Sequence, residues 1–213
     1  MRVAIVEDHA MMRDLLRRAC ERDFGAEVVF ECSAAGEVLE GVARTNPNLA
    51  ILDLQLPDAD GLSLMADLRK HHPGLKILIL SSRCDPCTVY RVERARADGF
   101  IDKGSQTVDM LGSALTALAV NRIWYSPAFA RLRTERLRNP LSFDKLLTDR
   151  EQTVLGMLGD CFGDREIAAK LEISPETAAK HRFNLLHKLD LRSTPELMRY
   201  ARAQGFSSSA PLP

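Results

Sequence analysis

The stretch "LAILDLQLPDADG", residues 49–61, is an apolar run that ends on a carboxylate at Asp53 and then breaks up at Pro57 and Gly61. A short apolar run bounded by turn residues is typical of a strand buried on both faces, as the strands of parallel sheets are. Helical patterns alternate with such runs through residues 1–121, which favours an α/β domain: a doubly wound, five-stranded parallel sheet with helices on both faces. The expected strands are "RVAIV" (2–6), "EVVFE" (27–31), "LAILD" (49–53), "KILIL" (76–80) and "GFID" (99–102).

Composition indicates a globular protein. The chain has 213 residues, enough for one large domain or two small ones, and 46% of them are hydrophobic and 27% charged. No apolar stretch approaches the roughly 18 residues of a membrane helix, and no charged start precedes an apolar core, so we expect no membrane segment and a cytoplasmic location. The five cysteines, an odd number, suit free thiols in a reducing compartment better than a disulfide framework.

Charge and pattern divide the chain into two parts. Residues 1–121 hold 14 Lys and Arg against 18 Asp and Glu, whereas residues 122–213 hold 15 against 11. An acidic part therefore precedes a basic part that could meet a polyanion. We interpret residues 122–143 as a linker. Residues 144–206 show only helical periods, which predicts a second, smaller all-α domain, and residues 207–213 should form a disordered tail.

Side chains that carry chemistry follow the ends of the expected strands. They are Glu7, Asp8, Asp53, Ser81 and Lys103. In an open parallel sheet, ligands bind beyond the carboxyl ends of the strands, so we expect these side chains to meet at one edge. Carboxylates gathered there would repel one another by roughly 4 kcal/mol per pair at about 4 Å and an effective dielectric constant of about 20. A cation must offset that repulsion.

A magnesium ion would meet this need. Mg²⁺ prefers oxygen ligands and typically takes one or two carboxylates together with phosphate oxygens. Asp8 and Asp53, with the backbone carbonyl of Gln55, would supply its protein ligands. Lys103 would supply a second cation and Ser81 a hydroxyl donor for a phosphate. We therefore interpret Asp53 as a phosphoryl acceptor beside a metal.

Four sequence marks carry a resemblance to a known family. They are the acidic pair at residues 7–8, the stretch "DLQLPDADG" that begins at Asp53, the hydroxyl residue Ser81, and "GFIDK", which ends at Lys103. With these marks, residues 1–121 resemble the receiver domain of a two-component response regulator, a flavodoxin-like fold. The resemblance implies that Asp53 takes a phosphoryl group from phosphohistidine on a partner sensor histidine kinase, with Mg²⁺ as cofactor.

The resemblance also implies roles for the residues around Asp53. These are the metal ligands Asp8, Asp53 and Gln55 (through its backbone carbonyl), Glu7 behind them, and the phosphate-binding and switch residues Ser81, Lys103 and Phe100. On phosphorylation the hydroxyl would move toward the phosphoryl group and the ring would swing into the vacated space. Phe100 stands where many relatives have Tyr, so the switch would lack a phenolic hydrogen bond. Gly104 follows Lys103 where many relatives have Pro.

The motif "CDPC" from Cys84 to Cys87 allows two interpretations. Two thiols separated by two residues at a helix start can have lowered pKa values and redox activity. A single CxxC without a thioredoxin-like pattern is weak evidence, however. We expect ordinary packing and keep a redox input to the switch loop as the alternative.

The basic part contains a helix-turn-helix pattern. The segment "LLTDREQTVLGML" (146–158) has Thr148 followed three residues later by Glu151, a capping box that opens a helix. Two further helical segments, 163–171 and 174–189, are joined by a short turn. Two short helices joined in this way describe a helix-turn-helix.

The second helix of this motif is the expected reader of DNA. Its inward face is assigned to Ala178, His181, Leu185 and Leu189, and the opposite stripe would enter the major groove. The predicted DNA-binding residues are Thr177, Lys180, Arg182, Phe183, His187 and Lys188. Phe183 could touch a thymine methyl group or could be buried.

Residues 146–206 resemble the LuxR-type DNA-binding domain through "LTDRE", "REIAAKLEIS" and "ETAAKHRFNLLHKLDL". The whole chain therefore resembles a response regulator of the NarL/FixJ family. This implies double-stranded DNA as a partner and a homodimer, when phosphorylated, formed through Leu197, Tyr200 and Ala201 of the last helix. That apolar strip could equally cover the domain's own core. Ala179 stands where relatives usually carry a DNA-contacting lysine.

The leading hypothesis is a DNA-binding response regulator and not an enzyme. Phosphorylation of Asp53 would switch the receiver and promote dimeric DNA binding to control transcription. One alternative is a metal-dependent phosphatase with Asp53 as nucleophile, although Gln55 stands where such enzymes need a second acid. The other alternative is a receiver-based protein-interaction regulator with weak or no DNA binding, which Ala179 and Phe183 suggest.

Overall fold

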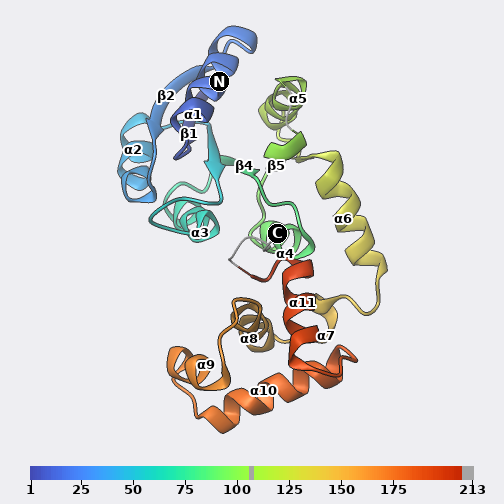
Figure 1. Ribbon diagram of the computed structural model, residues 1–213. Coiled ribbons are helices and arrows are strands. Elements are labelled where there is room, and N and C mark those ends of the chain that lie inside the picture. The colour runs from blue at the N-terminus through green and yellow to red at the C-terminus, as the bar shows by residue number, and fades with distance from the viewer. Residues whose placement is uncertain (106–107, 208–213) are drawn as a thin grey trace. The chain divides into compact units, whose positions relative to one another are not determined.

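The computed structural model describes residues 1–105 and 108–207 (Figure 1). The expected tail, 207–213, lies outside the described residues except for Ser207. The chain forms two compact units: Met1–Cys84 with Arg91–Arg131, and Asp85–Tyr90 with Leu132–Pro213. One boundary, between Arg131 and Leu132, falls inside residues 122–143, the segment expected as the linker. The other boundaries enclose Asp85–Tyr90, which the sequence placed in the first domain and which groups with the second unit. In the described part of the chain, no helix combines the length and the apolar character that crossing a membrane demands.

The first unit is built on the parallel sheet that the sequence predicts. Its strands are β1 (Arg2–Val6), β2 (Glu27–Cys32), β3 (Leu49–Asp53), β4 (Lys76–Ser81), β5 (Gly99–Asp102) and β6 (Trp124–Tyr125), and they lie in the order β2-β1-β3-β4-β5-β6. All neighbouring strands pair in parallel. The first five strands confirm the prediction. The sixth lies in the expected linker and was not predicted, because two residues show no periodicity.

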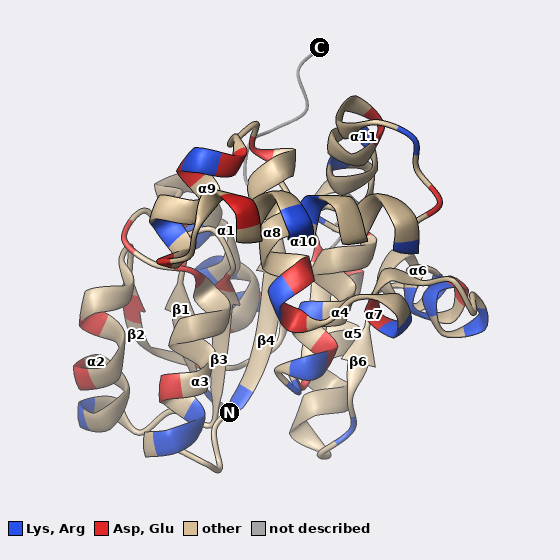
Figure 2. Cartoon of the chain, turned by 90° about the horizontal axis from the view of Figure 1, so that it is seen from below, with Lys and Arg blue, Asp and Glu red and all other residues tan. Residues whose placement is uncertain are grey.

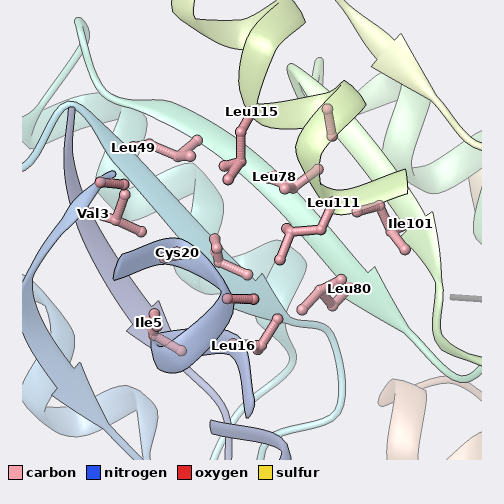
Figure 3. Close-up of a cluster of buried hydrophobic side chains, with 14 of the residues drawn as sticks. Val3, Ile5, Leu16, Cys20, Leu49, Leu78, Leu80, Ile101, Leu111 and Leu115 are labelled. Carbon is pink, nitrogen blue, oxygen red and sulfur yellow. The ribbon is translucent and has the colours of Figure 1, made fainter. Parts of the chain in front are cut away.

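Helices cover both faces of this sheet. They are α1 (Ala10–Arg18), α2 (Val38–Thr45), α3 (Gly61–His71), α4 (Pro86–Arg94) and α5 (Val108–Ala119), with short turns of π-helix at Ala19–Asp23 and of 3₁₀-helix at Ala35–Glu37 and Lys103–Ser105. One face packs against α1 and α5, as Figure 3 shows for Leu16, Leu111 and Leu115 over Leu78 and Ile101. Every residue of β3 is buried, as a strand covered on both faces requires.

The strand order places one edge of the sheet where ligands bind in such folds. β1 pairs with β2 on one side and β3 on the other, so the chain reverses its direction of winding at β1. Open α/β sheets bind ligands beyond the carboxyl ends of the strands at this point. Val6 lies beside Leu52 and Ser81 beside Asp102. The residues that follow β1, β3, β4 and β5 therefore share one edge.

The second unit is helical. After α6 (Pro127–Arg138), which begins in the first unit, it contains α7 (Phe143–Leu146), α8 (Asp149–Gly159), α9 (Asp164–Leu171), α10 (Pro175–Lys188) and α11 (Thr194–Gln204). The predicted capping box is present, since Thr148 and Glu151 each accept a hydrogen bond from the other's backbone N–H. Ser174 caps α10, and Glu172 makes the turn from α9 in the left-handed conformation. The helix-turn-helix that the sequence predicts is thus α9 and α10.

Candidate functional site

Asp53 and Glu7 meet on a single lysine at the carboxyl edge of the sheet. Lys103 Nζ lies 2.7 Å from Asp53 Oδ2 and 2.7 Å from Glu7 Oε2. Asp53 is 3% exposed and Glu7 is fully buried. The sequence predicted that these three side chains converge, and the ends of β1, β3 and β5 bring them together.

Burial and charge act in opposite directions in this cluster. Burial raises the pKa of Glu7, and the close contact with the positively charged Lys103 offsets that effect only in part. Burial alone would lower the pKa of Lys103, but its hydrogen bond to Asp53 and its ion-pair contacts with Asp53 and Glu7 outweigh this and raise the pKa above its usual value. Lys103 is therefore held as a cation beside two acids.

The loop after β3 is shaped around the Asp53 carboxylate. Asp53 Oδ1 accepts the Gln55 backbone N–H at 3.0 Å. A side chain at Gly61 would approach the Asp53 backbone oxygen to 2.4 Å, so only glycine allows this close return of the chain. Asp58 accepts the backbone N–H groups of Ala35 and Gly36, which hold its pKa below the usual value. Hydrogen bonds at Gln55 and at Asp58 therefore hold the loop after β3 in place.

The acidic cluster suits a hard cation. Glu7, Asp8 and His9 each offer a ligand atom, and these atoms lie within 4.8 Å of one another. Glu7 Oε2 is buried and, despite its contact with Lys103, receives no hydrogen bond of acceptable geometry. Carboxylate oxygens are the ligands that Mg²⁺ prefers. The carboxylates of Glu7 and Asp8 therefore suit Mg²⁺, which receiver domains generally bind. Asp53 is bonded to Lys103 and to the Gln55 backbone N–H, so the ligand set of Asp8, Asp53 and the Gln55 carbonyl stays a prediction.

The two expected switch residues are both fully buried. The Ser81 hydroxyl accepts the Arg83 backbone N–H at 3.0 Å. Its neighbour Ser82 donates to Gln55 Oε1 at 2.6 Å, which joins the loops after β3 and β4. Phe100 packs with its ring centroid 4.8 Å from that of Phe129 in α6. Because both side chains are fully buried, neither could move as part of a switch unless the residues packed around it moved as well.

The surface of α10 carries most of the predicted DNA-binding residues. Thr177, Lys180, Phe183, His187 and Lys188 are exposed, and Phe183 has 68% of its surface free, so it is not buried. Figure 2 marks basic residues on this helix. Leu185 and Ala178 face the core, as predicted.

Two of the predicted DNA-binding residues have partners within their own unit. Arg182 donates from Nε and Nη2 to the Asp164 carboxylate of α9 and from Nη1 to the Thr194 hydroxyl. Lys188 Nζ lies 2.8 Å from Glu151 Oε2 at the start of α8. Both cations therefore join helices of the unit, a role that the sequence analysis did not give them.

The predicted dimer strip requires a correction. Leu197 and Ala201 are fully buried in the core of the second unit, and Tyr200 packs against that core. Burial raises the pKa of Tyr200. A side chain without exposed surface cannot form an interface with a second chain. The alternative interpretation, that the strip covers the domain's own core, is the one the packing supports, and the exposed residues of α11 include Pro195, Arg199 and Ala203.

The cysteines are free thiols, as expected. Burial raises the pKa of Cys20 to about 12 and that of Cys32 to about 11. In the CDPC motif, Cys87 is buried in the core of the second unit and Cys84 is half-buried. Burial of this kind supports packing over redox chemistry for Cys87.

Some functional positions carry no signal in the sequence. His9 joins the acidic cluster although histidine is not a usual Mg²⁺ ligand, and Asp58 ties the loop through backbone N–H groups that no motif predicts. Phe129 covers Phe100 from a segment that the sequence analysis assigned to a linker.

Two family matches agree with this geometry. Residues 3–114 match the response regulator receiver domain, and residues 145–201 match the bacterial regulatory proteins of the luxR family. The first match covers more than half of the chain and ends within α5. The second spans α8, α9 and α10 and most of α11.

Curated relatives are similar along nearly the whole chain. A nitrate/nitrite response regulator protein homolog of Haemophilus influenzae is 32% identical, over 91% of this chain and 92% of its own length. The oxygen regulatory protein NreC of Staphylococcus haemolyticus is 29% identical, over 94% of this chain and 96% of its own.

Solved structures share the fold. RcsB from Salmonella enterica serovar Typhimurium bound to promoter P1flhDC gives a TM-score of 0.69 at 24% identity, covering 95% of this chain and 98% of that one. The same protein bound to promoter rprA gives a TM-score of 0.67 at 26% identity, covering 94% and 97%. Because the matching family is one of transcription-factor response regulators, the phosphatase alternative is not supported. The chain belongs to the two-component response regulators of the NarL/FixJ family, which join a receiver domain to a LuxR-type helix-turn-helix.

Proposed function

We propose that Asp53 accepts a phosphoryl group from a sensor histidine kinase, and that the phosphorylated chain binds duplex DNA as a dimer to control transcription in the cytoplasm. The observation that carries this proposal is the pairing of Asp53 and Glu7 on Lys103 Nζ, 2.7 Å from each, at the carboxyl edge of the sheet. Family membership supports the proposal independently.

The side chains around Asp53 suit phosphoryl transfer. An Asp53 carboxylate oxygen attacks the phosphorus of a phosphohistidine, so that an O–P bond forms as the N–P bond breaks. Lys103 places a positive charge where the phosphoryl oxygens gather negative charge, and Ser81 has a hydroxyl to donate. Asp8, Asp53 and the Gln55 carbonyl would hold Mg²⁺, with Glu7 behind them. When bound, the ion would neutralise charge on the transferred group.

Phosphate incorporation tests this step. The full chain is incubated with acetyl phosphate and Mg²⁺ and its phosphorylated fraction is measured on a phosphate-affinity gel. Asp53→Asn should abolish incorporation, whereas Asp67→Asn, which alters an exposed acid of α3, should leave it unchanged. Incorporation that persists in Asp53→Asn would place the acceptor elsewhere.

The proposed DNA surface is the exposed stripe of α10. Thr177, Lys180, Phe183 and His187 are exposed there, whereas Arg182 already forms an ion pair with Asp164. Lysine contacts to phosphates make affinity fall with salt, and reading two half-sites together raises affinity steeply in a dimer. RcsB, a structural relative, has been solved as dimers bound to DNA. For this chain we propose a dimer that uses surfaces other than Leu197 and Ala201.

A titration of duplex DNA at several salt concentrations, with and without beryllofluoride, tests this surface. Lys180→Ala should weaken binding and make it less dependent on salt, whereas Lys70→Ala, an exposed lysine of α3, should not. Binding that is absent at every salt concentration would favour the alternative, a protein-interaction regulator. The 68% exposure of Phe183 is the observation that favours this alternative, because an exposed phenyl ring suits a protein partner.

A further inference from the structure

The receiver is joined to α6, the helix that carries the chain into the second unit, by packed aromatic side chains. Three aromatic rings form a continuous stack between β5, β6 and α6, which we call the aromatic stack: Phe100, Tyr125 and Phe129. The ring centroids of Phe100 and Phe129 are 4.8 Å apart, and those of Tyr125 and Phe129 are 4.4 Å apart with planes inclined by 25°. Phe100 and Phe129 are both fully buried.

The backbone holds the same junction. Phe100 pairs with Tyr125 in the parallel register of β5 and β6. The Phe100 carbonyl accepts the Ser126 backbone N–H at 2.9 Å, and Ser126 is fully buried. The Tyr125 hydroxyl donates to the Ala97 carbonyl at 3.2 Å. Both the ring and the carbonyl of Phe100 therefore contact the segment from which α6 begins.

Close packing limits how Phe100 can move. Protein interiors have few voids larger than a water molecule, so a buried ring cannot change its rotamer unless its neighbours move with it. The neighbour of Phe100 on the α6 side is Phe129, which lies in the first turn of that helix and has no exposed surface. α6 then continues from the first unit into the second at Leu132.

We propose that the aromatic stack transmits the phosphorylation state of Asp53 to α6, with Phe129 as the positioning residue that couples Phe100 to this helix. This inference rests on the proposed function. It assigns the output of the receiver to the β6–α6 junction, a segment that the sequence analysis treated as a linker. Phe129 touches neither the phosphoryl group nor DNA; it acts through Phe100.

A spectroscopic test exploits the single tryptophan of the chain, Trp124. It lies in β6 next to Tyr125 and packs against the core on the α1 and α5 face. Adding beryllofluoride and Mg²⁺ to the full-length chain should change Trp124 emission, and Asp53→Asn should remove the change. Phe129→Leu should reduce the change by at least about half relative to the wild type, because its side chain cannot rebuild the ring contact.

A matched control separates coupling from general loosening of the core. Phe30→Leu makes the same substitution in β2, at the opposite edge of the sheet, where the half-buried ring packs over Gly41. It should leave the emission change at its wild-type size. Far-ultraviolet circular dichroism verifies that each variant is folded, and Phe129→Met provides a second variant with a longer, more flexible side chain if Phe129→Leu does not fold.

DNA affinity supplies the functional readout. In the wild type, beryllofluoride should tighten DNA binding by a factor on the order of 5 to 150, the usual range for coupling between sites. In Phe129→Leu this factor should fall toward 1, while the phosphorylated fraction with acetyl phosphate stays at the wild-type value. A wild-type response that Phe129→Leu retains in full would overturn the inference and leave the proposed function standing. A wild type that responds neither in emission nor in DNA affinity would overturn both.

Discussion

The carboxyl edge of the receiver sheet and the surface of α10 were both predicted as functional, and they differ in how tightly the fold determines them. At the sheet edge, Asp53, Glu7 and Lys103 are brought within ion-pair distance by the ends of three strands. On α10, some predicted residues are exposed, but Arg182 and Lys188 are held by acids of neighbouring helices. Parallel strand ends converge because of backbone topology, whereas the use of a helix face depends on what packs beside it.

The difference predicts how each region tolerates substitution. At the sheet edge, a change should affect stability and phosphorylation together, because the buried side chains are the same ones that we propose take part in phosphoryl transfer. On α10, stability and DNA binding should separate residue by residue, according to whether the side chain has a partner in its own unit. The following substitutions test this contrast.

The largest effect is expected for Lys103→Met. Removing this cation leaves Glu7 and Asp53 as buried acids without their shared partner, which should lower the free energy of unfolding by about 3 kcal/mol. Phosphorylation by acetyl phosphate should also fall. Urea unfolding at neutral pH gives the stability. The double variant Lys103→Met, Glu7→Gln should recover part of the lost stability. If Lys103→Met alone is as stable as the wild type, the ion pairs do not hold this edge of the sheet together.

A smaller effect is expected for Arg182→Ala. Its guanidinium donates from Nε and Nη2 to the Asp164 carboxylate and from Nη1 to the Thr194 hydroxyl, so its loss should lower the free energy of unfolding by about 1 kcal/mol. DNA affinity should fall less than in Lys180→Ala. Arg199→Ala, an exposed arginine of α11, is the matched control for stability. A large loss of DNA affinity with unchanged stability would instead make Arg182 a DNA contact.

The ion pair at the start of α8 should make stability depend on pH. Burial would raise the pKa of Glu151, but the hydrogen bonds from Lys188 and Thr148 outweigh it and lower the pKa below its usual value. A carboxyl group with a lowered pKa in the folded state contributes stability above its unfolded pKa and loses it as the pH falls through the folded pKa. Glu151→Gln should therefore cost about 1 kcal/mol near neutral pH and progressively less below about pH 4.

Urea midpoints measured for both proteins between about pH 6 and about pH 3 check this prediction. The two curves should converge toward acid. Curves that stay parallel would mean that the Glu151 carboxylate has no net role in the folded state. Glu166→Gln is the control, because Glu166 caps α9 in the same way but is exposed and has no buried ion pair among the described contacts.

The smallest effect on stability is expected for Phe183→Ser. The ring is 68% exposed, so removing it should change the free energy of unfolding by less than about 0.5 kcal/mol. Leu185→Ala, two residues later and fully buried, should cost about 3 kcal/mol. If Phe183→Ser changes DNA affinity without changing stability, the ring belongs to the binding surface; if it changes neither, the ring has no part in DNA binding.

Sequence patterns predicted the parts of the fold that depend on local period. The five longer strands follow from apolar runs, and α8 and α10 from their caps at Thr148 and Ser174. They also predicted that Glu7, Asp53 and Lys103 meet, because parallel strands present their carboxyl ends at one edge.

The features that sequence patterns missed depend on contacts between distant segments. β6 exists because two residues find a partner in β5, and Phe129 is buried because Phe100 lies beneath it. Leu197 and Ala201 form an apolar strip on α11 whether they face a core or a second chain, so spacing alone could not distinguish the two. Only packing against α8 resolves that choice.

The central claim, that Asp53 carries the phosphoryl group beside Lys103 and the acids of β1, is tested most directly by locating the modification. The chain is phosphorylated with acetyl phosphate and Mg²⁺, reduced with borohydride, which converts an aspartyl phosphate to homoserine, and digested for mass spectrometry. Homoserine at residue 53 is the predicted result. Homoserine at any other aspartate, with residue 53 unmodified, would contradict the account.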